Sequence, residues 1–318
     1  MCIKKDIVRL VLLFPLLIVT ANSIAETSTE NSYKPLGDEA YQVVLSLFEY
    51  DKSHQLNART VDKRESLHSI REKISFTTSN RKRVSGYLAL PKSGEGPFPC
   101  ILLLHGLADS KEKWLKLPEW GHESAVYDND ISNKLINAGF AVFAIDAEFH
   151  GERSVNNDYE TPKVFFGAER AYQGREMLIQ TIIDYRLSID YLESRSEIDA
   201  NRIGALGYSM GGGMTFGLAA IDSRIKTVVS CVGISNQTMN PLPSASPLSP
   251  ITYTPHIKST QLLMLMAKND PFYSVETARK VFESIPSKTK NIIFYDSKHD
   301  LPKPFQDESV DWFNKHLK

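Results

Sequence analysis

The chain has 318 residues, of which 42% are hydrophobic and 24% charged, an ordinary globular composition with enough length to bury a large core. Its formal net charge is −1, and the absence of a basic stripe or acidic tail argues against nucleic acid or another polyanion as a partner. One large α/β domain or two small ones fit this length.

The first 25 residues have the pattern of a secretory signal peptide. Basic residues at positions 4, 5 and 9 precede the apolar run Leu10–Val19, and Ser23 and Ala25 are small enough for a cleavage site. The apolar run is short for a membrane span, although an uncleaved anchor is the alternative. We therefore expect an exported protein, periplasmic or extracellular, that begins near Glu26 and has no stable membrane span after cleavage.

Residues 26–66 are expected to form a leader and one helix ahead of a catalytic domain at residues 67–318. Residues 26–35 are polar, which is typical of a flexible leader. In Asp38–Tyr50 the apolar residues recur at helical spacing, so we expect a helix there that lies outside the core.

From residue 67 onward the pattern indicates strands. Ile74–Thr78 and Val84–Leu90 alternate like antiparallel strands joined by a turn. Later runs are apolar throughout and alternate with amphipathic helices, which is typical of a parallel sheet covered on both faces. These expected strands are Cys100–Leu104, Ala141–Ile145, Arg202–Leu206, Ile225–Cys231, Gln261–Met266 and Asn291–Tyr295. The expected helices are Ile131–Ala138, Arg175–Ser194, Met210–Ala220, Ser274–Ser284 and Glu308–Leu317.

Two long segments are irregular. Gly233–His256 contains five prolines between two expected strands, where either a substrate-covering loop or a plain surface excursion fits. In residues 108–130, Trp114, Trp120 and Tyr127 could line an aromatic pocket, and packing in the core is the alternative.

Two cysteines, Cys100 and Cys231, follow the expected signal peptide. Export would permit a disulfide, but both residues lie in apolar strand-like runs, so we expect buried free thiols. No paired C-x-x-C spacing is present, so the sequence carries no zinc signature and predicts no metal site.

The most informative motif is Gly207-Tyr-Ser-Met-Gly211, a G-x-S-x-G run between an expected strand and an expected small-residue helix. A serine hydroxyl is a poor nucleophile until the backbone presents it beside a base. A sharp strained turn does so, and the flanking glycines let other chain segments pass closely. The sequence therefore predicts Ser209 as a nucleophile, with an incidental glycine-rich turn as the alternative.

A base and an orienting acid are expected at the carboxyl ends of other strands. His299 follows the last expected strand, and Asp270 follows the strand before it, which gives the chain order Ser…Asp…His. His299 would take the Ser209 proton and return it to the leaving group, and Asp270 would orient the imidazole. Asp296 and Asp300 are rival acids, but they lie too close to His299 in sequence to reach the far side of its ring easily.

A tetrahedral intermediate needs two N–H donors. One is expected from Met210, after the nucleophile and at a helix N-terminus. The second is expected from the loop after Cys100–Leu104, at Leu107, with Gly106 as the alternative. His105 and His150 also follow strands, and we interpret His150 as structural or pocket-lining.

Taken together, His105-Gly106, Asp146…His150-Gly151, the pentapeptide at 207–211, Asp270 and His299 resemble the α/β-hydrolase superfamily. More closely, they are similar to its dienelactone-hydrolase-like and prolyl-oligopeptidase-like serine hydrolases, including acetyl-xylan-esterase-like members. Over residues 70–318 the resemblance implies an eight-stranded, mostly parallel sheet with helices on both faces and an antiparallel second strand. It also implies that the two cysteine-bearing strands are two apart, with the thiols at opposite ends.

Two departures limit the resemblance. Dienelactone hydrolases proper use a cysteine nucleophile where this chain has Ser209, so their lactone substrate is not transferred. We also expect no β-propeller ahead of the domain, unlike in the oligopeptidases. The glycine run at 211–213 lacks both the dinucleotide spacing and a P-loop lysine, so no cofactor is expected.

The sequence thus predicts an exported serine esterase acting on a small-molecule ester through an acyl-enzyme on Ser209. One alternative keeps the reaction but uses a peptide or amide substrate. The other is a non-catalytic binding protein on the same fold. The oligomeric state does not follow from the sequence.

Overall fold

A computed structural model of the chain describes residues 36–78, 80–115, 130–166, 168–235 and 249–318. Residues 34–318 form one compact unit. The expected signal peptide, its cleavage site, Trp120, Tyr127 and the middle of Gly233–His256 lie outside the described residues. Within the described ranges, none of the helices combines the length and apolarity needed to cross a bilayer.

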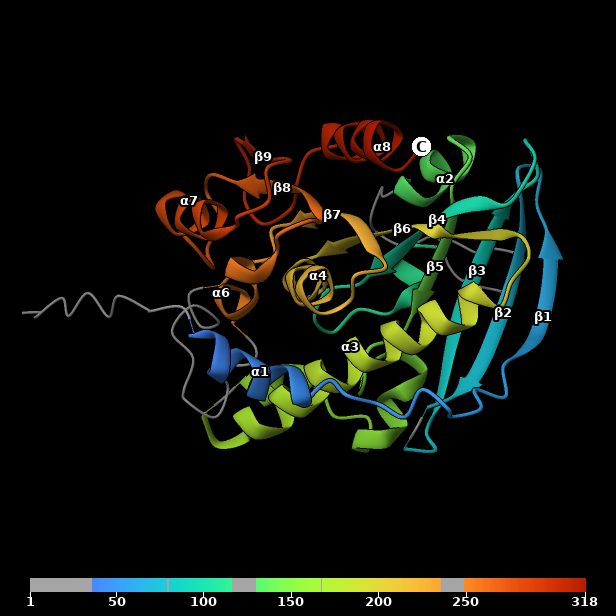
Figure 1. Cartoon of the computed structure of the whole chain (residues 1–318), viewed down its shortest axis with the longest axis horizontal. Helices are drawn as coiled ribbons and strands as arrows, with labels where there is room; N and C mark the ends of the chain where they lie inside the picture. Colours follow the sequence, from blue (N-terminus) through green and yellow to red (C-terminus); the bar gives the residue numbers. More distant parts are fainter. Residues whose placement is uncertain (1–35, 79, 116–129, 167, 236–248) are drawn as a thin grey trace, which may run out of the picture. The chain divides into compact units, whose positions relative to one another are not determined.

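The unit is built on a single sheet of nine strands in the order β1-β2-β3-β5-β4-β6-β7-β8-β9 (Figure 1). β3 runs antiparallel to both of its neighbours, β2 and β5. The other six strands on that side of β3, which are β5, β4, β6, β7, β8 and β9 in sheet order, are parallel to one another. The strands are β1 Arg59–Glu65, β2 Ser69–Thr77, β3 Arg83–Pro91, β4 Phe98–Leu104, β5 Ala141–Ile145, β6 Ile198–Tyr208, β7 Ile225–Cys231, β8 Gln261–Ala267 and β9 Lys290–Tyr295.

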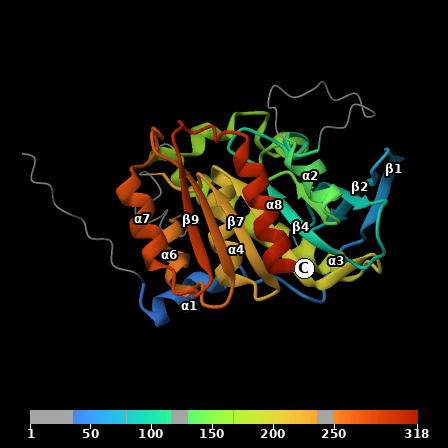
Figure 2. The same ribbon diagram turned by 90° about the horizontal axis from the view of Figure 1, so that it is seen from above.

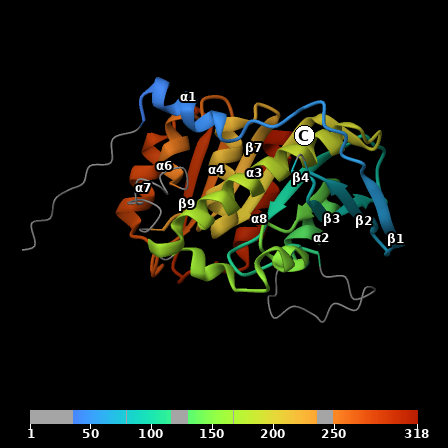
Figure 3. The same cartoon turned by 90° about the horizontal axis from the view of Figure 1, so that it is seen from below.

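Helices cover both faces of this sheet, as the uninterrupted apolar strands require. Figure 2 shows α8 (Pro304–Leu317) crossing one face, with α2 (Ile131–Asn137) beside it. Figure 3 shows the opposite face covered by α3 (Ala171–Glu193) and α4 (Met210–Ile221), with α1 (Asp38–Ser46) further out. The remaining elements are α6 Pro250–Tyr253, α7 Val275–Ser284 and the short 3₁₀ segments η1 Lys111–Lys113, η3 Gly151–Asn157, η4 Pro162–Phe166, η5 Ala168–Arg170 and η7 Thr254–His256.

All eight expected strands are present, and the antiparallel second strand of that set is β3. The expectation of eight strands misses β1, which adds a ninth strand antiparallel to β2. The sequence Arg-Thr-Val-Asp-Lys-Arg-Glu shows no apolar alternation because β1 is an exposed edge strand that buries no face. Hydrophobic periodicity therefore carries no signal for it.

The N-terminal helix α1 also differs from expectation, because its inner face belongs to the core. Tyr41 and Val44 on the helix, and Phe48 just after its end, are almost fully buried. The ring of Tyr41 stacks on His256 with ring centroids 3.4 Å apart, and Phe48 packs edge-on against Tyr253. The helical spacing of these apolar residues reflects a packed helix and not an external one.

Cys100 on β4 and Cys231 on β7 are both buried free thiols, as expected. β6 lies between the two strands, and Cys100, near the start of β4, pairs with Ile203 in the middle of β6, whereas Cys231, at the end of β7, pairs with Tyr208 at the end of β6. The two thiols therefore lie at opposite ends of strands that are not neighbours, beyond the reach of a disulfide.

Candidate active site

Ser209 occupies the sharp turn between β6 and α4. Its backbone angles are φ 55° and ψ −118°, a conformation that residues with a side chain rarely adopt. A β-carbon on Gly207 would lie 2.1 Å from the carbonyl oxygen of Gly211, and one on Gly211 would lie 2.2 Å from that of Leu104. Only glycine fits at either position, so the pentapeptide forms the strained turn that its spacing predicts.

The side chains of Ser209, His299 and Asp270 form one hydrogen-bonded chain. Nε2 of His299 lies 2.9 Å from Oγ of Ser209, and Nδ1 lies 2.7 Å from Oδ2 of Asp270. Ser209 follows β6, Asp270 follows β8 and His299 follows β9, so three strand ends bring the groups together. The other carboxylate oxygen of Asp270 accepts the backbone N–H of Phe272 at 2.9 Å, which fixes the orientation of the carboxylate.

The rival acids lie elsewhere. Asp296 accepts a hydrogen bond of 2.9 Å from the side-chain amide of Asn269, and Asp300 is exposed and lines the cavity described below. Neither has a described hydrogen bond to the ring of His299.

Tyr208 is a supporting residue that sequence reasoning missed. Its hydroxyl donates to the carbonyl of His299 at 2.9 Å and accepts the N–H of Leu301 at 2.8 Å, so it holds both sides of the loop that carries the histidine. The only signal in the sequence is a tyrosine at a variable position of the pentapeptide, which does not predict this role.

The expected N–H donors lie around the same point. Met210 is the first residue of α4, so its N–H has no acceptor inside the helix. Leu107 lines the cavity beside Ser209, and a β-carbon on Gly106 would lie 3.6 Å from that of Ser209. Both segments that carry the expected donors therefore lie beside the nucleophile.

His105 fixes the direction of one donor. Its Nδ1 lies 2.8 Å from the carbonyl oxygen of Gly106, and its Nε2 accepts the N–H of Ala147 at 2.9 Å. The second bond places the proton on Nδ1, which donates to Gly106. Because C=O and N–H point in opposite directions across a trans peptide, the N–H of Leu107 points away from the His105 ring.

His105 and His150 are neutral structural groups. Burial lowers the pKa of each imidazole to about 4. Their ring centroids are 5.1 Å apart, and Nδ1 of His150 lies 2.9 Å from the carbonyl of Glu148. His150 is buried and is not among the residues that line the cavity beside Ser209, which favours the structural interpretation over the pocket-lining one.

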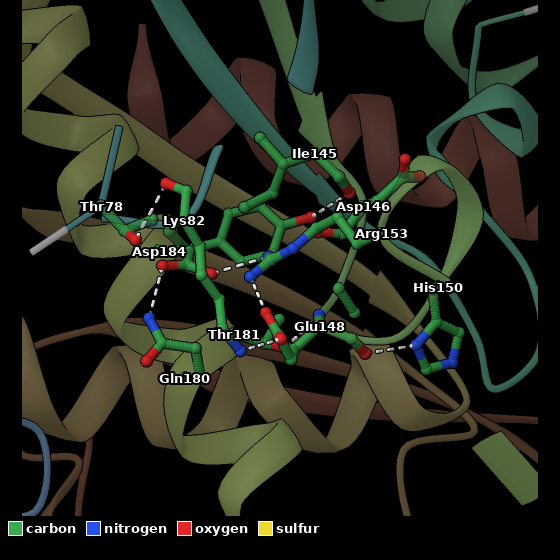
Figure 4. Close-up of polar contacts among 12 residues, drawn as sticks. Thr78, Lys82, Ile145, Asp146, Glu148, His150, Arg153, Gln180, Thr181 and Asp184 are labelled. Carbon is green, nitrogen blue, oxygen red and sulfur yellow. Dashed lines mark hydrogen bonds and ion pairs between the residues drawn. The ribbon is translucent and has the colours of Figure 1, made fainter. Parts of the chain in front are cut away.

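A buried polar cluster anchors the loop after β5, which supports His105 (Figure 4). The guanidinium of Arg153 pairs with Glu148, lies 2.7 Å from Asp184 on α3 and donates to the carbonyl of Asp146 at 3.1 Å. Asp146 itself is fully buried, and its Oδ2 accepts a hydrogen bond of 2.6 Å from the ammonium of Lys111. Every charge in the cluster has a partner, which low-dielectric surroundings require.

Ser209 opens onto a cavity of about 610 Å³, a size typical of small-molecule sites. Described parts of Gly233–His256 contribute to its lining, which includes Ile234, Pro250 and Tyr253. Trp114 is buried and is not among the lining residues, so it packs in the core. Within the described ranges, no three His, Cys, Asp or Glu side chains are grouped so as to hold a metal ion.

Comparisons with known proteins agree with this architecture. The structure resembles acetyl xylan esterase from Paenibacillus sp. R4 with a TM-score of 0.66 and 16% identity, covering 90% of this chain and 98% of that one. Acetyl xylan esterase 1 from Thermoanaerobacterium sp. JW/SL YS485 gives a TM-score of 0.64 and 16% identity, covering 89% and 95%. At these identities the likeness establishes the α/β-hydrolase fold.

Sequence comparison goes further. YtaP of Bacillus subtilis (strain 168), which is named as a hydrolase, is 29% identical over 192 residues, or 57% of this chain. The match spans 58% of YtaP, so the chain covers little more than half of that relative's length. Residues 116–300 match the dienelactone hydrolase family. Since that match covers more than half of the sequence and includes the segments that carry Ser209, Asp270 and His299, the chain belongs to the dienelactone hydrolase family.

Proposed function

We propose that the protein is a serine hydrolase that cleaves carboxylic esters through an acyl-enzyme on Ser209. The observation that carries this proposal is the hydrogen-bonded chain from Ser209 through His299 to Asp270 at the cavity. A strained serine with its hydroxyl 2.9 Å from an imidazole is the arrangement that nucleophilic acyl transfer needs. Family membership supports hydrolase chemistry in general.

In the proposed reaction, Nε2 of His299 takes the Ser209 proton as Oγ attacks the ester carbonyl. The carbonyl oxygen becomes an oxyanion, which the N–H groups of Leu107 and Met210 stabilise. His299 then donates the proton to the alcohol oxygen, and the C–O bond breaks. Water, deprotonated by His299, attacks the acyl-enzyme and releases the acid, and the proton returns to Ser209.

Asp270 keeps His299 in the productive tautomer. Its carboxylate accepts from Nδ1, so Nε2 has a free lone pair facing Ser209. The same carboxylate stabilises the imidazolium that forms during each half-reaction.

The test is hydrolysis of p-nitrophenyl acetate by Ser209→Ala and by the matched control Ser223→Ala, which lies in the exposed turn after α4. We expect kcat/KM to fall by at least about 1,000-fold in the first variant and to stay near the wild-type value in the second. Wild-type turnover by Ser209→Ala would overturn the proposal. Faster cleavage of aminoacyl amides than of esters by the wild type would favour a peptidase instead.

We also propose that the protein is exported, on the evidence of the charged, apolar and small residues at positions 1–25. Expression of the full chain in a bacterial host followed by fractionation and N-terminal sequencing tests this. A mature N-terminus near Glu26 in the exported fraction is expected, and an intact Met1 in the cytosol would contradict it.

A further inference from the structure

The lining of the cavity beside Ser209 divides into two parts by exposure. One part is enclosed and apolar, and we call it the inner lobe. Its residues are all buried, although they border empty space. The inner lobe is formed by Leu178 and Ile182 on α3, Met214 and Gly217 on α4, and Pro250 and Tyr253 on α6.

The other part is the mouth, which is open and polar. Phe272 is 51% exposed there, and Lys163 and Asp300 are also exposed. Asp109 and Lys113 form an ion pair of 2.6 Å, and the Lys113 ammonium lies 4.9 Å from the ring centroid of Tyr208. None of the six residues that form the inner lobe is charged, and the charged residues of the described lining, Asp109, Lys113, Lys163 and Asp300, all lie outside it.

Ser209 directly precedes α4, which lines the inner lobe, and its hydroxyl lies 2.9 Å from Nε2 of His299, so the stereochemistry of the proposed reaction assigns one end of the substrate to each part. The leaving alcohol oxygen must receive its proton from Nε2 of His299, so the alcohol lies on the histidine side. Phe272, whose ring centroid is 4.8 Å from that of His299, and Asp300 lie on this side, which is the mouth. The acyl substituent leaves the carbonyl carbon in the other direction, toward α4 and the inner lobe.

The inner lobe has room for more than an acetyl group. Gly217 follows Met210 by about two turns of α4, which places it roughly 10 Å along the helix axis. An extended chain advances about 1.2 Å per bond, so a path of this length takes about eight bonds. Ile182 packs directly against Gly217, because a β-carbon at Gly217 would lie only 2.9 Å from Cδ1 of Ile182, so these two residues set the width of the inner lobe between α3 and α4.

We infer that the inner lobe binds the acyl chain, and that the preferred substrates are esters of medium-chain aliphatic acids, of about six to eight carbons, with a small or polar alcohol at the mouth. This inference rests on the proposed serine esterase function and adds the substrate class to it. It separates this chain from proteins whose site takes an acetyl group alone.

The experiment measures kcat/KM for two series of esters. In the first, the p-nitrophenyl alcohol is constant and the acyl chain grows from acetate to dodecanoate. We expect kcat/KM to rise by up to about fourfold per methylene as far as hexanoate or octanoate, since each buried methylene contributes about 0.8 kcal/mol, and then to fall. In the second, the acyl group is constant and the alcohol grows, and we expect less than about threefold variation.

A larger and a smaller side chain at Ile182 both test whether the acyl chain binds in the inner lobe. Ile182→Phe narrows the inner lobe and should move the optimum to shorter acyl chains, with the octanoate-to-butanoate ratio of kcat/KM falling at least about tenfold. Ile182→Ala widens it and should move the optimum to longer chains. The matched control is Val43→Phe, a comparable enlargement on the exposed face of α1, which should leave the ratio unchanged.

Circular dichroism and thermal melting confirm that each variant is folded, and the ratio of two substrates on one preparation cancels any loss of active protein. The rate at which alkyl phosphonates of increasing chain length inactivate Ser209 gives a second readout. It should follow the same order as the acyl series.

The two proposals fail in different ways. Hydrolysis that depends on Ser209 but is fastest for acetate, or a chain-length optimum that Ile182 variants do not move, would overturn the acyl assignment and leave the esterase function standing. The acyl assignment would also be overturned if Ile182 variants changed the preferred chain length of the alcohol and not that of the acyl group. The inner lobe would then hold the leaving group. Hydrolysis that persists in Ser209→Ala would overturn the function itself.

Discussion

Nδ1 of His105 donates to the carbonyl of Gly106 across 2.8 Å, although the two residues are neighbours in the chain. This bond sets the plane of the peptide that joins Gly106 to Leu107. The N–H at the other side of that plane is one of the two proposed oxyanion donors. Since the His105 ring is also held by the N–H of Ala147, the loop after β5 controls the direction of a donor that belongs to the loop after β4.

Removing this imidazole should therefore slow the reaction more than it weakens binding. For His105→Ala we expect kcat to fall about 10- to 100-fold and KM to change less than about threefold, because a misdirected donor loses stabilisation only in the transition state. Steady-state kinetics, normalised by end-point titration with a fluorophosphonate, measure both values. The exposed His68→Ala is the control, and a rise in KM with unchanged kcat would contradict the assignment.

The acid that orients His299 can be identified by substitution of three aspartates. Asp270→Asn should reduce kcat by about 1,000- to 10,000-fold, because an amide at this position favours the wrong tautomer of the imidazole. Asp296→Asn and Asp300→Asn should retain kcat within about threefold, because neither carboxylate has a described bond to the ring. A comparable loss in either control would show that Asp270 does not act alone.

The strained turn at Ser209 predicts an effect on stability. Gly207→Ala would force a β-carbon to 2.1 Å from a backbone carbonyl that cannot move without displacing α4. We expect a loss of at least about 3 kcal/mol in the free energy of unfolding, or failure to fold. Gly37→Ala, where nothing lies within 4 Å of the added carbon, should change it by less than about 1 kcal/mol. Urea denaturation of both variants measures the difference.

Much of the site was predictable because its residues directly follow apolar strands. The pentapeptide specifies its own turn, and the parallel-sheet rule then brings Asp270 and His299 to the same edge as Ser209. These inferences need only local patterns and topology. The strands from β4 to β9 were predictable from their apolar runs, and β2 and β3 were predictable from their alternation of apolar and polar residues.

The remainder depends on contacts between distant segments. β1 buries no face, so its sequence carries no strand pattern, and α1 was expected outside the core because helical spacing does not say what a helix packs against. Tyr208 and His105 act through hydrogen bonds to backbone groups, which any tyrosine or histidine could make. The inner lobe is formed by three helices, so its shape follows only from their packing.

The buried cluster around Arg153 gives a second prediction about stability. Arg153→Met would leave the carboxylates of Glu148 and Asp184 without their buried guanidinium partner, so we expect a loss of about 3–5 kcal/mol. Lys73→Met removes a partly exposed partner of Glu152 and should cost less than about 1 kcal/mol. Urea denaturation at pH 7 compares the two variants. A small effect of Arg153→Met would mean that water enters the cluster.

Acid stability should depend on His150. Burial lowers the pKa of its imidazole to about 4, whereas the same group in the unfolded chain titrates near 6.5. Between these values the unfolded chain binds more protons than the folded one, so stability rises with pH through this window and is lost as the pH falls from about 6.5 to 4. Over this whole pH range, the imidazole of His150 alone should lower the free energy of unfolding by about 3 kcal/mol.

The variant His150→Asn isolates this effect, because its amide can still donate to the carbonyl of Glu148 but does not titrate. At pH 5.5 we expect the slope of unfolding free energy against pH to fall by about 1.2 kcal/mol per pH unit relative to the wild type. His256 and His316, whose pKa values burial also lowers, remain in both proteins and cancel in the difference. The neighbouring His105 is neutral at pH 5.5 in the folded state, because burial lowers its pKa to about 4. Carboxylates with lowered pKa values, such as Glu197 at about 2, contribute only below this pH. An unchanged slope would mean that His150 takes up a proton in the folded state as readily as in the unfolded chain, and that the site around it is open to water.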